Sequence, residues 1–293
     1  MSELISQYCD FNDLNMLKKA GKILGFIILI LLVIILITLR IMDFRWSDKK
    51  YTAKFDKKQV SFTANSIQID QSQIHYLESG DTAHQPIMFI HGAPGSLRDF
   101  KTYLWDAELI QKTNMRAVDR PGYGYSGYGQ PERSIQKQAD FIQQVIKDSS
   151  VVIGHSYGGP VAAAIAMNYP EKVKHLILLA PAVDPQHEKQ FVPKVLGKAP
   201  FKYLFSRAIQ VAFEEKFAHE AALEDLLPDW NKITCPVTVV HGRNDHIVPF
   251  ENMAFLKQKL DDNSEFLPVD DMNHIMIWSD FEFVKNLILE RLE

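Results

Sequence analysis

The stretch SSVVIGHSYGGPVAAA, residues 149–164, decides the fold of this chain. Its apolar part, Val151–Ile153, predicts a buried strand, and its alanine-rich end predicts a helix. Between them stands the pattern Gly-x-Ser-x-Gly, centred on Ser156. A residue on so sharp a turn adopts strained dihedral angles, and a Cβ atom at Gly154 or Gly158 would clash with the neighbouring elements. We therefore expect a strand, a tight turn and a helix that expose the hydroxyl of Ser156 as a nucleophile.

Short apolar runs alternate with helical patterns from Ser66 onward. An opening hairpin is predicted over residues 67–77, further strands at 87–90, 115–118, 151–153, 173–179, 237–240 and 265–269, and helices at about 97–111, 132–147, 157–169, 250–260 and 280–292. Near-continuous apolar strands separated by helices are typical of a mostly parallel sheet with helices on both faces, so the predicted fold class is α/β. The stretch 184–230 breaks this alternation, and its Phe-rich, helix-like composition predicts a small lid.

One long apolar run, Ile23–Leu39, follows an N-terminal segment of residues 1–22. At about 1.5 Å per residue the run spans roughly 25 Å, slightly less than the roughly 30 Å hydrocarbon core, and apolar residues beyond Arg40 extend it. Its apolar side chains cover every face, which argues against a buried core helix. The run is long for a signal peptide and ends without a small-x-small cleavage site. We therefore expect an uncleaved, single-pass membrane anchor.

The charged residues that follow the anchor predict a linker. Residues 40–60 lack a sustained apolar period, so we expect them to join the anchor to a folded domain of residues 61–293. Trp46 and Tyr51 are expected to lie at the membrane interface. Basic residues occur on both sides of the apolar run, and large domains often translocate regardless of such charges. The side of the membrane that carries the domain is therefore left open.

Composition excludes several classes of function. The net charge of -4 argues against nucleic acid as the main partner, because phosphate binding needs a concentrated excess of Lys and Arg. The two cysteines, Cys9 and Cys235, imply no disulfide framework. No His, Cys and Asp cluster has metal-ligand spacing, and no phosphate-cradling or dinucleotide-binding loop occurs. We expect neither a metal nor a cofactor, and the oligomeric state is left open.

Two further loops follow predicted strands. The first is a His-Gly loop at residues 91–96, where the backbone N–H of Ala93 can pair with that of Tyr157 to form an oxyanion hole. Tyr157 also lies at the start of the predicted helix, whose dipole favours developing negative charge. By itself the His-Gly loop is also compatible with an ordinary tight turn, which is the less favoured alternative. In the second loop, Asp119 and Arg120 are expected to hold the loop together through ionic hydrogen bonds rather than to act in catalysis.

The candidate acid and base lie late in the chain. Asp245 follows a predicted strand and a Gly-x-x-Asp turn, where a carboxylate can orient an imidazole and stabilise its charged form. Asp184 also follows a predicted strand and remains the rival acid. His274 comes after the last predicted strand, which completes the order Ser, Asp, His. We expect Ser156, Asp245 and His274 to form a triad, with His155 and His246 shaping the turns.

Over roughly residues 60–293 the chain resembles the α/β-hydrolase fold family, in its serine-hydrolase branch. The resemblance rests on five segments in a fixed order: His91–Gly95, Asp119–Ser126, Gly154–Gly159, Gly242–Asp245 and Asn273–His274. It implies a sheet of about eight strands flanked by helices, with the lid inserted after the sixth strand. Relatives that act on epoxides or haloalkanes carry Asp as the nucleophile, so Ser156 argues against those reactions.

The expected activity is hydrolysis of a carboxylic ester through an acyl-enzyme on Ser156, with a small-molecule or lipid-like ester as the substrate. A prolyl-aminopeptidase-like activity is an alternative, because those relatives resemble residues 91–96, although Ala93 departs from their Gly. The predicted lid offers few acids to bind a peptide amine: Glu188, Glu214, Glu215 and Glu220. Acyl transfer to hydrogen peroxide and a non-catalytic membrane-bound binding module are further alternatives. The acyl and alcohol specificity is left open.

Overall fold

The computed structural model describes residues 2–69, 72–190 and 192–292, and the side chains from residue 16 onward within those ranges. The chain divides into two compact units, each of which is described by itself. The first unit comprises Met1–Met42 and Ala199–Ser206, and the second comprises Asp43–Lys198 and Arg207–Glu293.

The first unit consists of a long helix and a short segment from the predicted lid. Helix α1 (Ser2–Ile41) contains a stretch, Lys18–Ile41, that is long and apolar enough to cross a membrane. None of this stretch is buried within the structure, which argues against a core helix. The 3₁₀ turn η6 (Phe201–Leu204) belongs to the same unit, and the N–H of Ser206 donates to the carbonyl oxygen of Leu39 over 2.9 Å.

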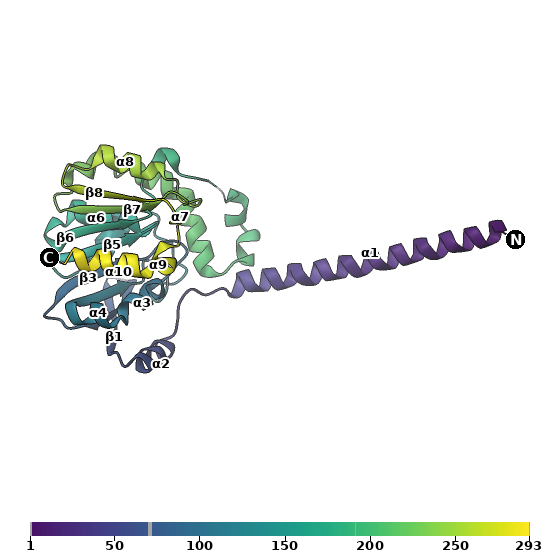
Figure 1. Cartoon of the computed structure of the whole chain (residues 1–293), viewed down its shortest axis with the longest axis horizontal. Coiled ribbons are helices and arrows are strands. Elements are labelled where there is room, and N and C mark those ends of the chain that lie inside the picture. Colours follow the sequence, from purple (N-terminus) through teal and green to yellow (C-terminus); the bar gives the residue numbers. More distant parts are fainter. Residues whose placement is uncertain (1, 70–71, 191, 293) are drawn as a thin grey trace. The chain divides into compact units, whose positions relative to one another are not determined.

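The second unit is built on one sheet, shown with its flanking helices in Figure 1. Among the described residues the sheet has eight strands: β1 (Phe62–Ile69), β2 (Ser72–Gly80), β3 (Gln85–Ile90), β4 (Thr113–Val118), β5 (Ser150–His155), β6 (Val173–Leu179), β7 (Val237–Gly242) and β8 (Ser264–Val269). Their spatial order is β1-β2-β4-β3-β5-β6-β7-β8. The pairs β1–β2 and β2–β4 are antiparallel, and the remaining pairs are parallel. The predicted opening hairpin and mostly parallel sheet are confirmed.

Two apolar layers cover the two faces of the sheet. The helical elements of the second unit are α2 (Asp48–Lys58), η1 (Leu97–Phe100), α3 (Lys101–Leu104), α4 (Ala107–Lys112), α5 (Ile135–Ile142), η2 (Gln143–Val145), α6 (Gly158–Asn168), η3 (Pro170–Lys172), η4 (Pro185–His187), η5 (Lys194–Gly197), α7 (Arg207–Glu224), η7 (Leu227–Lys232), α8 (Glu251–Lys259), α9 (Met276–Ser279) and α10 (Phe281–Glu290). Helices α5, α6 and α8 pack on one face, and α2, α3, α4, α9 and α10 pack on the other. Neighbouring strand residues alternate between these layers, as in β5, where Val152 faces the first and Ile153 the second.

The helix predicted over residues 97–111 is broken into η1, α3 and α4. The break has a local cause, because the carboxylate of Asp106 accepts the N–H groups of Glu108 and Leu109 and so caps α4 as a separate helix. The helix predicted over 132–147 begins only after Ser134, whose side chain accepts the N–H of Lys137. Sequence periodicity therefore located both helical regions but not their ends.

The structure corrects the prediction of a free linker at residues 40–60. From Asp43 onward the chain belongs to the second unit, and α2 packs on it through Tyr51 and Phe55, which are 1% and 0% exposed. Tyr51 is therefore a core residue and not an anchor at the membrane interface. The two aromatic residues stand four positions apart and share one helix face, a spacing hidden by the lysines around them.

The residues just before α2 also contact the rest of the second unit. The guanidinium of Arg45 lies 3.9 Å from the ring centroid of Tyr128 and donates to the carbonyl oxygen of Gly124 over 3.2 Å. The carbonyl oxygen of Phe44 accepts the hydroxyl of Ser96 over 2.7 Å. These contacts hold Phe44 and Arg45 on the rest of the second unit.

Candidate active site

Ser156 lies on the turn between β5 and α6 with a left-handed backbone, φ 54°. Its N–H donates to the carbonyl oxygen of Leu179 over 3.0 Å, which fixes the turn against β6. A Cβ atom at Gly154 would lie 2.4 Å from the carbonyl oxygen of Gly158, and one at Gly158 would lie 2.3 Å from that of Ile90. Both distances are too short for any side chain, so the turn requires the two glycines. The predicted strand, strained turn and helix are all present.

His274 lies between Ser156 and Asp245. Its Nε2 atom is 3.0 Å from the Oγ atom of Ser156, and its Nδ1 atom is 2.7 Å from an oxygen of Asp245. The three side chains follow β5, β7 and β8, whose carboxyl ends meet at one edge of the sheet. With the Nδ1 proton directed at Asp245, Nε2 can accept the proton of Ser156. The structure thus brings together the three residues predicted as a triad.

Asp245 is held as a carboxylate. One of its oxygens accepts the N–H groups of Ile247 and Val248 over 2.9 and 2.8 Å, and the other faces His274 and, at 3.5 Å, Nε2 of His241. Burial by itself would raise the pKa of Asp245, but the hydrogen bonds from His241 and His274 outweigh it and hold the pKa well below 3.8. The ionised form is the one that can orient and stabilise an imidazolium.

The rival acid, Asp184, is engaged elsewhere. Its carboxylate accepts the N–H of Gln186 over 2.9 Å and lies 2.6 Å from Nδ1 of His187. The structure pairs His274 with Asp245 instead. His155 has the neighbouring role expected of it, because its Nε2 atom lies 2.9 Å from the backbone oxygen of His274.

The His-Gly loop passes beside the hydroxyl of Ser156. A Cβ atom on Gly92 would lie 3.0 Å from Cβ and 3.4 Å from Oγ of Ser156, so this backbone is close to the position that an attacked carbonyl would occupy. Ala93 is the next residue in that loop. Tyr157 directly follows Ser156 and precedes the first turn of α6. Ala93 and Tyr157 thus belong to the two segments next to Ser156, and the role of their N–H groups as oxyanion donors stays a prediction.

A buried arginine fixes the His-Gly loop. The side chain of Arg120 is 0% exposed and donates to the backbone oxygens of His91 and Gly92 over 2.8 and 3.1 Å. Its guanidinium also lies 4.6 Å from the ring centroid of Tyr157. Arg120 therefore contacts both segments that carry the predicted oxyanion donors. The prediction that it has a structural role agrees with these contacts.

The partner of Arg120 is Glu215 of α7, which sequence reasoning missed. The two side chains form a fully buried ion pair at 2.7 Å, and Glu215 also accepts from Tyr123 and Gln138. Burial by itself would lower the pKa of Arg120, but Glu215 outweighs it and raises the pKa above its ordinary value. A buried arginine needs a partner of opposite charge, so Arg120 in its glycine-rich loop indicates that an acidic side chain from another segment pairs with it. The sequence does not identify that acidic residue.

The inserted segment contributes a second set of paired charges. The ring of His219 stacks on that of Tyr157 with centroids 4.5 Å apart, and its Nδ1 atom is 3.0 Å from a carboxylate oxygen of Glu188. Lys216 also pairs with Glu188. Burial tends to raise the pKa of Glu188, but His219 and Lys216 together lower it. Two of the acids considered for binding a peptide amine, Glu188 and Glu215, are thus already paired.

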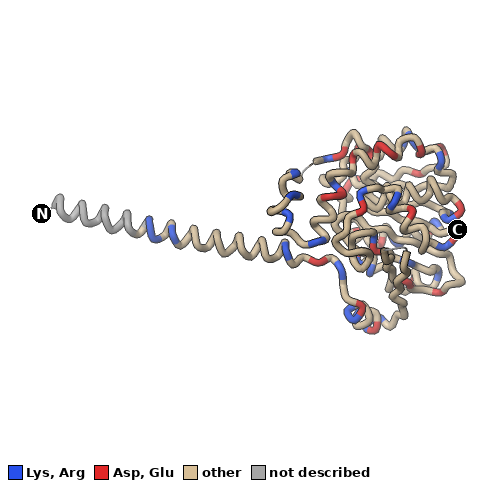
Figure 2. The backbone as a smooth tube through the Cα atoms, turned by 180° about the vertical axis from the view of Figure 1, so that it is seen from behind, with Lys and Arg blue, Asp and Glu red and all other residues tan. Residues whose placement is uncertain are grey.

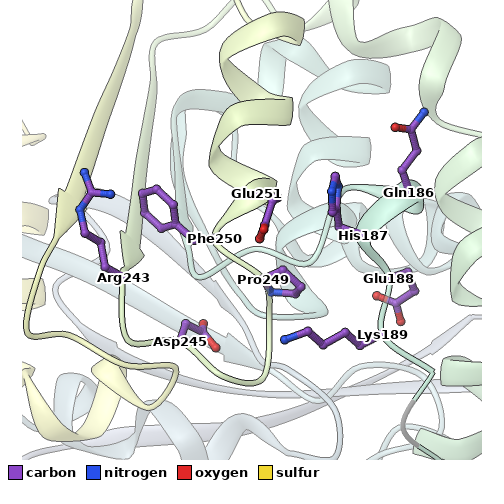
Figure 3. A pocket seen from close by; sticks show the side chains of 9 residues that line it. All are labelled: Gln186, His187, Glu188, Lys189, Arg243, Asp245, Pro249, Phe250 and Glu251. Carbon is purple, nitrogen blue, oxygen red and sulfur yellow. The ribbon is translucent and has the colours of Figure 1, made fainter.

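A cavity of about 450 Å³ opens beside the side chain of Asp245, as Figure 3 shows. Its lining carries both signs of charge: Gln186, His187, Glu188, Lys189, Arg243, Asp245, Pro249, Phe250 and Glu251. Lys189 extends toward the loop that carries Asp245, and its ammonium lies 3.5 Å from the carbonyl oxygen of His246. Among the described residues, no group of three His, Cys, Asp or Glu side chains is arranged to hold a metal ion.

Comparison with known proteins finds relatives among the α/β hydrolases. Residues 85–203 match the family model described as alpha/beta hydrolase fold. An AB hydrolase superfamily protein of Bacillus subtilis is 25% identical over 255 residues, which cover 72% of this chain and 92% of that protein. Epoxide hydrolase 1 of Caenorhabditis elegans is 30% identical over 138 residues, 42% of this chain and 33% of that protein. The chain spans less than half the length of this and other curated relatives that it matches.

Solved structures extend the likeness over nearly the whole chain. A bacterial membrane phospholipase A, a virulence factor, has a TM-score of 0.62 at 18% identity, covering 92% of this chain and 97% of that one. At this identity the likeness concerns the fold. Together with the eight-stranded sheet order and the family model that matches residues 85–203, it shows that the chain has the α/β-hydrolase fold.

Proposed function

We propose that this chain is a membrane-anchored serine hydrolase that cleaves a carboxylic ester through an acyl-enzyme on Ser156. One observation carries the proposal: Ser156, on its strained turn, forms a continuous hydrogen-bonded series with His274 and Asp245, over 3.0 and 2.7 Å. All three residues are less than a tenth exposed, so their charges interact in surroundings with little water.

The proposed reaction has two halves. His274 removes the proton of Ser156, and the freed oxygen attacks the ester carbonyl, while the N–H groups of Ala93 and Tyr157 stabilise the oxyanion. The tetrahedral intermediate collapses, and His274 gives its proton to the departing alcohol. Water then attacks the acyl-enzyme with His274 as the base, releasing the acid and restoring Ser156. Asp245 keeps the imidazole in the required tautomer throughout.

Two observations favour an ester over an epoxide or a peptide as the substrate. The epoxide hydrolase relative is similar over part of the chain, but the residue on the turn is Ser156, whose alkoxide forms an acyl-enzyme with a carbonyl. Binding of a peptide amine requires a free carboxylate, and Glu188 and Glu215 are both occupied by cations. The apolar helix α1, proposed as the anchor, favours amphiphilic esters because it holds the enzyme where they concentrate.

Ser156→Ala is the direct test. The full chain in detergent is assayed with p-nitrophenyl esters of increasing acyl length and labelled with a fluorophosphonate probe. We expect the variant to lose hydrolysis by about 10⁶-fold and to take up no label, as for other triads without their serine. Ser66→Ala, at an exposed serine of β1, is the matched control and should behave as wild type.

Equal hydrolysis and equal labelling in the Ser156→Ala and wild-type chains would refute the assignment. Labelling of Ser156 without turnover of any ester would instead point to another acyl acceptor or donor.

A further inference from the structure

The C-terminal end of α1 and the segment Ala199–Ser206 form one compact unit, although about 160 residues of chain separate them. The unit is closed by the hydrogen bond from Ser206 N–H to the backbone oxygen of Leu39, over 2.9 Å. In a regular helix the last carbonyl groups have no partner within the helix. The segment therefore satisfies a helix-end acceptor at the point where the apolar stretch stops.

The position of Leu39 in α1 determines the depth in the bilayer at which the Ser206–Leu39 hydrogen bond would lie. The apolar stretch Lys18–Ile41 is 24 residues long, about 36 Å at about 1.5 Å per residue, which exceeds the roughly 30 Å hydrocarbon core. Leu39 is thus within one helical turn of the end of the stretch, at the level where hydrocarbon gives way to headgroups. Residues bonded to it share that level.

The segment exposes large apolar side chains at this level. Phe201, Tyr203 and Leu204 are 45%, 60% and 39% exposed. Lys202 stands between them, with its ammonium 5.4 Å from the ring centroid of Tyr203. Aromatic rings next to a lysine, whose stem can extend its charge toward the headgroups, are typical of the interfacial layer of a bilayer.

The sequence around residues 199–206 carries only positive charge. Between Lys189 and Glu214 the chain contains no Asp or Glu, whereas Lys194, Lys198, Lys202 and Arg207 are basic. Figure 2 shows Lys and Arg but no acidic residue along this part of the tube. Basic residues at a bilayer surface are attracted by anionic lipids, worth about 1 kcal/mol each near the surface.

We propose that residues 199–206 are a second membrane contact, with Phe201, Tyr203 and Leu204 inserted into the headgroup layer of an anionic bilayer beside the end of α1. The proposal rests on the assignment of α1 as the membrane anchor and is independent of the ester chemistry. In the chain, the contact lies within the insertion between β6 and β7, so the insertion becomes a membrane-bound part of the enzyme.

Tryptophan quenching by brominated lipids tests the proposal. The full chain with Ser156→Ala, so that no lipid is consumed, receives Tyr203→Trp and is placed in nanodiscs of phosphatidylcholine and phosphatidylglycerol. The signal of the four native tryptophans is subtracted with the parent chain. Ile67→Trp, at a similarly exposed position on β1, is the matched control. We expect the tryptophan at position 203 to emit at shorter wavelength and to lose most of its intensity in brominated lipid, and the one at position 67 to change little.

Other outcomes separate the alternatives. Equal emission at position 203 in brominated and plain lipid would overturn the proposal. A shift to shorter wavelength without quenching would also overturn it, by showing that protein, such as a second copy of the chain, covers the segment. Lys202→Glu should reduce the quenching, and omission of phosphatidylglycerol should do the same. Failure of the anchor assignment gives a different result, because the chain would then not remain with the nanodiscs at all.

Discussion

Two buried Asp–His pairs in this molecule have nearly the same geometry. His274 lies 2.7 Å from Asp245, and His75 lies 2.8 Å from Asp119, each through Nδ1. Both carboxylates also accept two backbone N–H groups. Asp119 follows β4 and Asp245 follows β7, so both acids lie just beyond the carboxyl ends of strands of the same sheet.

The pairs differ in what the second imidazole nitrogen meets. Nε2 of His274 faces the hydroxyl of Ser156 at 3.0 Å. Nε2 of His75 is buried without a hydrogen-bond partner and lies 3.9 Å from an oxygen of Asp48. An Asp–His pair is therefore not a catalytic feature by itself. In the proposed mechanism a third element brings a nucleophile to the second nitrogen of His274, and that element is the turn between β5 and α6.

Replacing each carboxylate by its amide should separate the two pairs in activity, which is the largest expected effect. Asp245→Asn should lower kcat by about 10⁴-fold, because the amide favours the wrong imidazole tautomer, as in other triads. Asp119→Asn should change kcat by less than about tenfold per folded molecule, since His75 contacts no reacting group. Ester hydrolysis rates, divided by the amount of folded protein from circular dichroism, measure both. Similar losses in the two variants would make the distinction between the pairs untenable.

The same two variants should rank in the opposite order for stability. Asp245 receives both backbone N–H groups on one oxygen, so an asparagine can keep both and lose only the contacts of the other oxygen with His274 and His241. Asp119 receives the N–H of Leu97 on one oxygen and that of Tyr125 on the other. An asparagine has only one side-chain oxygen, so its NH₂ group would point at one of these two N–H donors. We expect the free energy of unfolding to fall by about 3 kcal/mol for Asp119→Asn and about 1 kcal/mol for Asp245→Asn. Urea denaturation measures both, and a reversed order would contradict the hydrogen-bond assignment.

The smallest expected effect is on acid stability. The pKa of Asp245 is lowered in the folded state, so its carboxylate contributes stability above about pH 3.8, and this contribution is lost as the pH falls through the folded-state value. The difference in the free energy of unfolding between the wild type and Asp245→Asn should therefore be largest at pH 7 and should decrease below about pH 4. Urea midpoints at pH 7, 5, 4 and 3 measure the difference. A gap that stays constant with pH would show that the carboxylate gains nothing from its charge.

Much of the triad could be predicted because it depends on strand order. Parallel strands end at one edge of the sheet, so residues that follow β5, β7 and β8 must meet there. The choice of Asp245 over Asp184 also had a local basis in its turn. The hydrogen bonds of Asp119 agree with the structural role predicted for it. Its partner His75 was not predicted, because β2 pairs with β4 as a neighbour in the sheet and no sequence pattern near His75 indicates that pairing.

The sequence by itself determined the apolar helix, the strained glycine turn and the alternation of strands and helices, since each depends on the period and residue types within a short stretch. Only the tertiary structure decided the contacts between distant stretches. These are the ion pair of Arg120 with Glu215, the packing of α2 through Tyr51 and Phe55, and the bond between Ser206 and Leu39. The physical reason is the same for all three. A buried charge, an aromatic pair or a helix-end carbonyl requires some partner, but its own sequence does not say which distant segment the fold will supply.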